Sequence, residues 1–254
     1  MPYVDDGAPR LWYEEAGTGP PVVLLHPGVA DRRIWKHVVP ALAARHRVVA
    51  LDQRGYGRSE PWDGPYSPAS DVVRVLDALG LERASLVGVS QGGKIALATA
   101  FERPERVEQL VLVAAALPGV PVEIHETPEQ EARWEEAEAS GDLETLVEID
   151  LEVWAPLGAD DELRTIFREN AEPSNADDAA LFPDPPVPER LHEVAAPTLV
   201  VTGGRDHPAF DEVARLLAEE IPDARRARIA DADHMVPWRT PDELARLLLD
   251  FLRA

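Results

Sequence analysis

The sequence has 254 residues, of which 45% are hydrophobic and 28% are charged, and it contains no cysteine. This length suits one large α/β domain, or a domain with an insertion, and the lack of cysteine excludes disulfides, thiol nucleophiles and thiolate metal sites. The 47 acidic and 25 basic residues give a net charge of −22, so the chain lacks the basic surface that binds nucleic acid or an anionic membrane.

The chain also lacks the signals of a membrane or secreted protein. No apolar run approaches the ~20 residues that span a bilayer. Asp5 and Asp6 stand where a secretory signal would carry basic residues and an apolar stretch. We therefore expect a soluble, cytoplasmic protein with no nucleic-acid partner and no membrane partner. The sequence leaves the oligomeric state open.

Short apolar runs alternate with helical patterns along the first 117 residues. The runs are nearly continuous in Val and Leu, which indicates strands buried on both faces, as in a parallel sheet between helices. Strands are expected at 10–15, 22–26, 47–52, 84–89 and 107–114. Apolar residues at three- and four-residue spacing predict helices at 34–45, 70–79 and 91–103.

An acidic segment interrupts this alternation. Residues 121–190 contain 21 acidic and 4 basic residues. Within them we expect helices at 129–139, 143–153 and 161–169, followed by a proline-rich return at 182–188. The alternation then resumes with strands at 198–202 and 226–229 and helices at 210–220 and 241–252, the last with Thr240 as N-cap. The sequence predicts a doubly wound, mostly parallel α/β core from residues 1–117 and 191–254, with 118–190 inserted as an acidic helical lid.

The strongest chemical motif follows the expected strand 84–89. It reads Gly88-Val89-Ser90-Gln91-Gly92-Gly93 and leads directly into a helix. A serine on a sharp strand-to-helix turn is presented clear of the backbone, and the small residues around it let the strand and helix pack closely. Ser90 is therefore the candidate nucleophile. The alternative is a serine that only caps the helix.

A serine nucleophile needs a base that is oriented by an acid. His234 follows the last expected strand, and Asp206 follows strand 198–202, so both lie at the carboxyl edge where ligands gather in open parallel sheets. Asp231 and Asp233 are other acids near His234, but they are too close in sequence to face the imidazole squarely. The alternative for Asp206 is a turn residue that caps the following helix.

An oxyanion hole is the fourth requirement. One donor is expected to be the backbone N–H of Gln91, directly after the nucleophile. The other is expected from the loop after strand 22–26, where Pro27 has no N–H but Gly28 does. We expect His26 to support this loop structurally.

These residues give the chain its resemblance to known proteins. Residues 10–117 and 191–254 resemble the α/β-hydrolase fold superfamily, in particular its small cap-bearing serine esterases, lactonases and haloperoxidase-like members. The resemblance rests on five segments in the family's order: Leu25–Gly28, Asp52–Ser59, Gly88–Gly93, Gly203–Asp206 and Asp233-His234. The order Ser90, Asp206, His234 matches the family's nucleophile, acid and base. His26-Pro27-Gly28-Val29 departs from the usual His-Gly-x-Pro loop.

The resemblance implies further structural details. Asp52–Ser59 corresponds to a structural turn in which glycines adopt φ > 0 and Arg54 pairs with nearby acids. The insertion corresponds to the lid.

It also implies a serine hydrolase that cleaves a carboxylic ester or lactone through an acyl-serine intermediate, without metal or cofactor. The acidic charge of the expected lid disfavours polyanionic substrates, so we expect a small neutral substrate. A haloperoxidase-like perhydrolase and a carbon–carbon bond hydrolase on the same triad are alternatives, and so is a ligand receptor of the same fold. Possible substrate contacts are Val29, Trp134, Trp154, Phe167, Phe182 and Met235. The alternative for the aromatic ones is that they pack the lid onto the core.

Overall fold

The sheet of this protein is twisted, open and mostly parallel. A computed structural model describes residues 2–4, 6–61, 66–117, 120, 127–171 and 188–252. Within them, eight strands follow the order β1-β2-β4-β3-β5-β6-β7-β8. Their bounds are β1 Tyr3–Val4, β2 Leu11–Ala16, β3 Pro21–Leu25, β4 Arg47–Leu51, β5 Ala84–Val89, β6 Val107–Val113, β7 Thr198–Gly203 and β8 Ala224–Ile229. β2 is antiparallel to β1 and β4, and every other pair is parallel, which confirms the predicted sheet.

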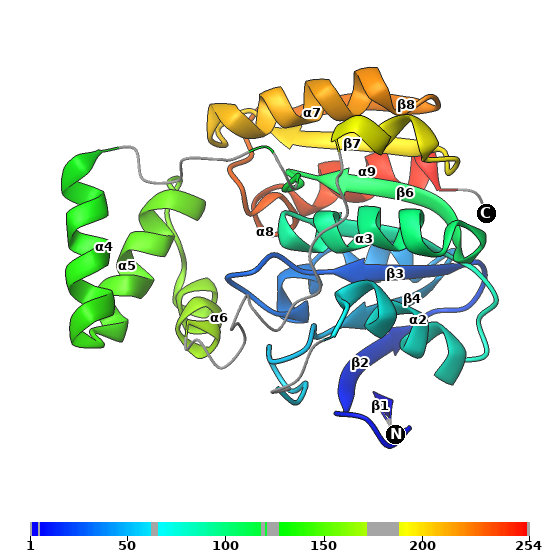
Figure 1. Ribbon diagram of the computed structural model, residues 1–254, viewed down its shortest axis with the longest axis horizontal. Coiled ribbons are helices and arrows are strands. Elements are labelled where there is room, and N and C mark those ends of the chain that lie inside the picture. The colour runs from blue at the N-terminus through cyan, green and yellow to red at the C-terminus, as the bar shows by residue number, and fades with distance from the viewer. Residues whose placement is uncertain are drawn as a thin grey trace.

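Helices cover both faces of the sheet (Figure 1). Their bounds are α1 Val39–Leu42, α2 Pro68–Ala78, α3 Gln91–Glu102, α4 Pro128–Ser140, α5 Leu143–Trp154, α6 Asp161–Asn170, α7 Pro208–Glu220, α8 Val236–Arg239 and α9 Pro241–Phe251. Successive residues of a strand point to opposite faces, so Val22 and Leu24 of β3 pack with α9 while Val23 and Leu25 pack with α2, α3 and α7. None of the described helices is both long and apolar enough to span a membrane.

One predicted helix is wrong. The pattern at 34–45 predicts a continuous helix, but the chain forms a 3-10 turn at Arg32–Trp35 and then the short α1. Pro40 explains the break, because its ring has no N–H to continue the hydrogen-bond ladder and is tolerated only in the first turn of a helix. The short α8 was not expected. Thr240 is the N-cap residue of α9 by position, but its hydroxyl donates to Val236 O instead of capping.

The acidic insertion contains the three helices predicted for it. Each begins at a side chain that accepts from the first turn: Thr127 for α4, Asp142 for α5 and Asp160 for α6. Figure 1 shows α4–α6 as a unit beside the sheet core, with α4 outermost. Its inner residues, including Val147 and Phe167, join the core cluster on the α9 face. Of the proline-rich return, residues 182–187 lie outside the described residues. We call α4–α6 the helical unit below.

The turn at Asp52–Ser59 has the structure that the resemblance implies. Gly55 and Gly57 have φ values of 78° and 54°. Arg54 forms a buried ion pair with Asp71. A side chain at Gly57 would overlap the carboxylate of Asp52, which is itself held by Arg32 at 2.9 Å.

The crossing of β5 and α3 depends on glycine. A Cβ at Gly88 would overlap the backbone carbonyl of Gly92 at the start of α3. We expect Gly88→Ala to lower the free energy of unfolding by about 3 kcal/mol or more, because neither backbone can yield. Gly141→Ala is the control, since a Cβ there meets open space and only the φ of 70° carries a cost of ~1 kcal/mol. Urea unfolding of both variants checks this, and equal losses would contradict it.

Candidate active site

Ser90 occupies the sharp turn between β5 and α3. Its backbone has φ 52° and ψ −114°, a region that residues with a side chain seldom adopt. The Ser90 N–H donates to Val113 O at 2.9 Å, and its carbonyl accepts from Lys94 and Ala116. These bonds hold the strained residue in place, so the backbone keeps the serine at the carboxyl edge of the sheet. Its side chain is partly exposed.

His234 and Asp206 are hydrogen-bonded to each other. His234 Nδ1 lies 3.0 Å from Asp206 Oδ2 and 3.2 Å from Oδ1, and both side chains are almost completely buried. Asp206 Oδ1 also accepts the His207 N–H at 2.7 Å, so this acid both orients the imidazole and supports the start of α7. A carboxylate at Nδ1 leaves Nε2 as the nitrogen that can take a proton.

Two glycines bring the loops of Asp206 and His234 together. A side chain on Gly203 would overlap Ala232 O, and one on Gly204 would overlap Ala230 O. Because both positions lack a side chain, the two loops come close enough for the Arg205 N–H to donate to Ala232 O at 2.8 Å. The sequence contains this signal as Gly203-Gly204 directly before Arg205-Asp206, but its role is visible only when both loops are seen.

Ser90 and His234 share an edge of the sheet but are not hydrogen-bonded. The strand register aligns Val89 with Val113, and Val113 with Val201, so the loops after β5 and β7 emerge at the same edge of the sheet, with β6 between them. Among the described residues, no hydrogen bond joins the Ser90 hydroxyl to His234. In enzymes without substrate this contact is often long and tightens only in the reacting complex.

Asp233 has a different role from Asp206. Its Oδ1 accepts the Met235 N–H at 3.2 Å, and its Oδ2 accepts from Arg239 at 2.7 Å and from the Leu157 N–H at 3.3 Å. Arg239 also donates to Gly158 O at 2.5 Å. Asp233 thus ties the histidine loop to the segment between α5 and α6. Its bonds leave Asp206 as the acid that faces the imidazole.

The two expected oxyanion donors lie next to each other. A Cβ on Gly28 would overlap Oε1 of Gln91, so a larger residue there would require the Gln91 side chain to move. Gly92 packs equally closely beneath the carbonyls of Leu25 and His26. The loop after β3 therefore lies against the N-terminus of α3, where backbone N–H groups are unpaired and favour negative charge.

A glutamine that sequence reasoning missed holds this loop. Gln53 accepts from Gln91 Nε2 at 3.1 Å and donates to His26 O at 2.5 Å. The Gln53 N–H donates to His26 Nε2 at 2.9 Å, so His26 Nδ1 donates to Pro27 O at 2.8 Å. Burial lowers the pKa of His26 and keeps the ring neutral, as this pattern requires. His26 supports the loop, as expected.

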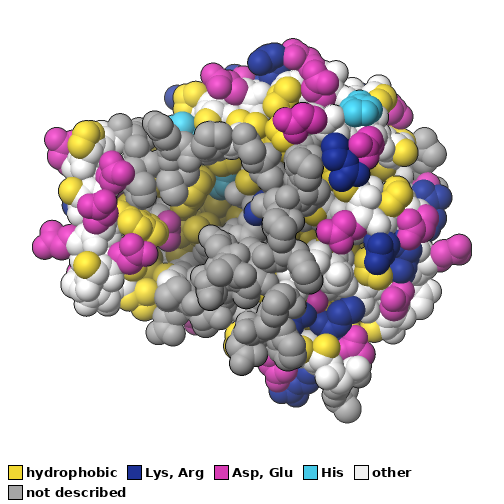
Figure 2. All heavy atoms as spheres, in the orientation of Figure 1, with side chains coloured by type: hydrophobic (Ala, Val, Ile, Leu, Met, Phe, Trp, Pro, Cys, Tyr) yellow, Lys and Arg dark blue, Asp and Glu magenta, His cyan; other side chains and the backbone are white. Residues whose placement is uncertain are grey.

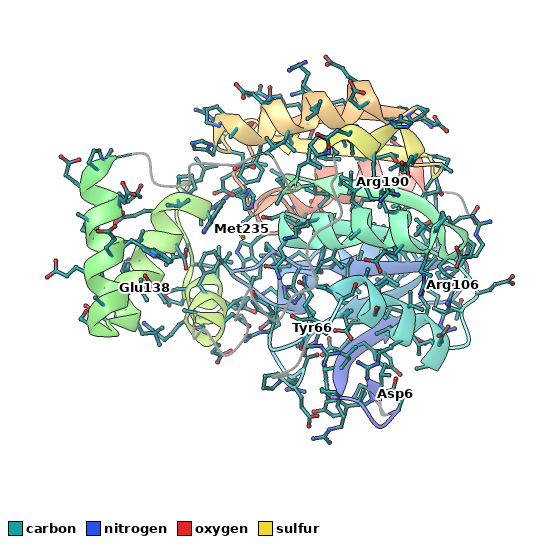
Figure 3. All side chains as sticks on the ribbon, viewed as in Figure 1. Asp6, Tyr66, Arg106, Glu138, Arg190 and Met235 are labelled. Carbon is teal, nitrogen blue, oxygen red and sulfur yellow. The ribbon has the colours of Figure 1, made fainter. Side chains whose placement is uncertain are left out.

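The expected substrate contacts separate into two groups. Figure 2 shows a hollow between the helical unit and the sheet core, with a mainly hydrophobic visible wall. The centroids of the Trp154 and His234 rings lie 4.6 Å apart. Phe210 of α7, which was not predicted, has its ring centroid 4.4 Å from that of His234. Phe167 and Met235 are fully buried in the core cluster and pack the helical unit onto the core, where Figure 3 places Met235.

The remaining expected contacts are two half-buried residues and one residue outside the described ranges. Val29 is half-buried against the core cluster, and Trp134 is half-buried on α4. Phe182 lies outside the described residues. In the described ranges, no group of three or more His, Asp or Glu side chains has the arrangement of a metal site.

Asp150 is a half-buried acid on α5. Its Oδ1 accepts from Trp154 Nε1 at 3.2 Å, and burial raises its pKa to about 6. A carboxyl whose pKa is higher in the folded than in the unfolded protein binds its proton more tightly when folded, so stability falls as the pH rises from about 4 through 6.

This acid gives a prediction for stability. At pH 7 we expect Asp150→Asn to raise the free energy of unfolding by about 1–3 kcal/mol, since the amide keeps the bond to Trp154 without the buried charge. Most of the gain should vanish near pH 4, where the folded carboxyl is protonated and the unfolded one is only partly ionised. Urea unfolding at the two pH values measures it, and a gain that is equal at both would contradict the assignment.

Comparison with known proteins assigns the family. The profile of the alpha/beta hydrolase fold matches residues 20–154. The chain is 32% identical to the putative carbamate hydrolase RutD of Azorhizobium caulinodans, across 99% of this chain and 98% of that one. It is 30% identical to a 2-hydroxy-6-oxononadienedioate/2-hydroxy-6-oxononatrienedioate hydrolase of Paraburkholderia xenovorans, across 97% and 92%.

A solved structure supports the same family assignment. The enol-lactonase of Burkholderia xenovorans LB400 matches with a TM-score of 0.73 at 28% identity, across 98% of this chain and 99% of that one. The protein belongs to the α/β-hydrolase fold family and is a hydrolase of that family.

Proposed function

We propose that this hydrolase cleaves small neutral carboxylic esters or lactones through an acyl-Ser90 intermediate. The observation that carries the proposal is the strained Ser90 turn at the same sheet edge as the His234–Asp206 pair. A backbone strained in this way persists only where the surrounding structure holds it, and such strain gathers at functional sites.

The mechanism assigns one role to each group. His234 Nε2 takes the proton of the Ser90 hydroxyl while the oxygen attacks the substrate carbonyl. The backbone N–H groups of Gln91 and Gly28 stabilise the oxyanion of the tetrahedral intermediate, and Asp206 stabilises the imidazolium. Collapse transfers the proton to the leaving alcohol and leaves the acyl-Ser90 ester. Water, deprotonated by His234, then releases the acid and restores the serine.

The helical unit would act as the lid of this site. Trp154 from α5 and Phe210 from α7 flank the imidazole, so the substrate would lie against aromatic surfaces beside the base. The net charge of −22 would disfavour anionic substrates, and this effect would weaken with salt.

A carbon–carbon bond hydrolase is the second candidate. It is favoured by the relative named as a 2-hydroxy-6-oxononadienedioate/2-hydroxy-6-oxononatrienedioate hydrolase, which matches over nearly the whole chain. That compound name describes a dianion. The charge argument therefore favours the ester or lactone.

A substrate panel with an active-site probe tests the proposal. A fluorophosphonate should label Ser90, and p-nitrophenyl butyrate or a γ-lactone should be turned over faster than the 2-hydroxy-6-oxo-dienedioate. At low salt, p-nitrophenyl butyrate should also exceed p-nitrophenyl hemisuccinate in kcat/KM, with a gap that narrows as salt is added. Faster cleavage of the dienedioate would support the second candidate. Labelling without turnover would support a ligand receptor, and efficient peracid formation a perhydrolase.

A further inference from the structure

Asp150 is half-buried, whereas most acids described in the helical unit are exposed. It lies one helical turn before Trp154, so the two side chains share a face of α5. Val147 and Leu151 on the same side of the helix belong to the core cluster. Since the Trp154 ring contacts the ring of His234, this face of α5 is the one turned toward the candidate site.

Only one oxygen of Asp150 is occupied. Oδ1 accepts from Trp154 Nε1, and Oδ2 has no hydrogen-bond partner among the described residues. Oδ2 is also absent from the unpartnered polar atoms that are sealed from solvent, so it reaches an accessible space. An acceptor of this kind, half satisfied at the wall of a site, is suited to bind a donor from a ligand.

No cation of the helical unit neutralises this carboxylate. The basic side chains described between 127 and 190 each pair with another acid, in the pairs Arg133–Glu152, Arg164–Glu148, Arg168–Glu144 and Arg190–Glu193. The raised pKa of Asp150 reflects the same isolation, because its cause is burial that is only partly offset by the Trp154 bond. A donor from the substrate would replace the solvation that this oxygen has lost.

We propose that Asp150 is a specificity-determining residue that accepts a hydrogen bond from an N–H group of the substrate. The inference rests on the proposed function and narrows its substrate class. The preferred ester or lactone carries a secondary amide, or a similar neutral N–H group, a few atoms from the scissile carbonyl. The carbonyl lies at Ser90, and the chain follows the indole of Trp154 to Asp150.

Matched substrates isolate this hydrogen bond. On the acyl side, p-nitrophenyl 3-acetamidopropanoate is compared with its N-methyl analogue, in which N–CH₃ replaces the N–H donor. On the alcohol side, 2-acetamidoethyl butyrate is compared with its N-methyl analogue. We expect the N–H substrate to exceed its partner in kcat/KM by about ten-fold or more on one of the two sides.

Asp150→Asn is the informative variant. Its amide oxygen can keep the bond to Trp154, which turns the NH₂ group toward the substrate, so one donor then meets another. In this variant the ratio of kcat/KM for the N–H substrate to kcat/KM for its N-methyl analogue should fall to about one or below. Glu138→Gln is the matched control, since Glu138 is an exposed acid of α4 (Figure 3) and its loss changes the net charge equally. It should keep the wild-type preference.

The outcomes separate this inference from the proposed function. If wild type and Asp150→Asn show the same preference on both sides, Asp150 does not read the N–H group and the inference is wrong. If neither Ser90 labelling nor ester turnover occurs, the proposed function fails. Calorimetry of 2-acetamidoethyl butyrate with Ser90→Ala and with Ser90→Ala/Asp150→Asn then tests the subsite alone. About ten-fold tighter binding by the first protein would support it, and equal binding would overturn it.

Discussion

Ser90→Ala should lower kcat on p-nitrophenyl butyrate by about 10⁴-fold or more, since acyl transfer has no other nucleophile to use. A residual rate above the uncatalysed one would reflect the oxyanion donors and substrate binding, which the variant retains. The fluorophosphonate adduct should disappear completely, and mass spectrometry of the labelled protein measures this directly.

Ser70→Ala is the control for this experiment. Ser70 is an exposed serine on α2. It has no role in the proposed mechanism. Its loss should change neither labelling nor kcat. Near-parental ester hydrolysis by Ser90→Ala would show that the nucleophile has been assigned to the wrong residue.

Asp206→Asn should lower kcat by about 10³–10⁴-fold with little loss of folding stability. An amide in place of the carboxylate favours the wrong imidazole tautomer and cannot stabilise the imidazolium. The measurement is steady-state kinetics on the same ester, together with urea unfolding to confirm that the fold is retained.

Asp233→Asn is the matched comparison, because both acids are buried and lie near His234. It removes the carboxylate that holds Arg239 at 2.7 Å, so it should lower the free energy of unfolding by about 2–3 kcal/mol. Its direct effect on the imidazole should be small, since Asp233 forms no bond to the ring among the described contacts. If Asp233→Asn lowered kcat more than Asp206→Asn, the roles assigned to the two acids would have to be exchanged.

The fold could be predicted wherever local pattern and global packing agree. Val22–Leu25 and Leu110–Val113 are apolar at every position because helices cover both faces of the sheet, and both lie in segments that were expected as strands. The helices of the acidic insertion were predicted from their helical pattern, and the structure adds Asp142 and Asp160 as the N-caps of two of them. The helix at 34–45 failed because its apolar spacing was given more weight than the missing N–H of Pro40.

The site was predicted as far as chain order and strand ends allow. Asp206 and His234 follow two neighbouring strands, so their meeting could be expected. Gln53 and Phe210 were missed because their partners are distant in sequence, although Gln53 lies within the Asp52–Ser59 segment that was expected only as a structural turn. Asp150 was one acid among 21 in the insertion. Only the packing of α5 distinguishes it from those on the outer surface.

The bonds of Asp233 make two movements interdependent. Leu157 and Gly158 are tethered to the loop of the imidazole through this one carboxylate and through Arg239. A movement of α5 and α6 away from the core, wide enough to admit a bulky molecule, has to break these hydrogen bonds or move the loop of His234 with it. In the proposed mechanism, product escape and the return of His234 to its position as the base would therefore be mechanically coupled.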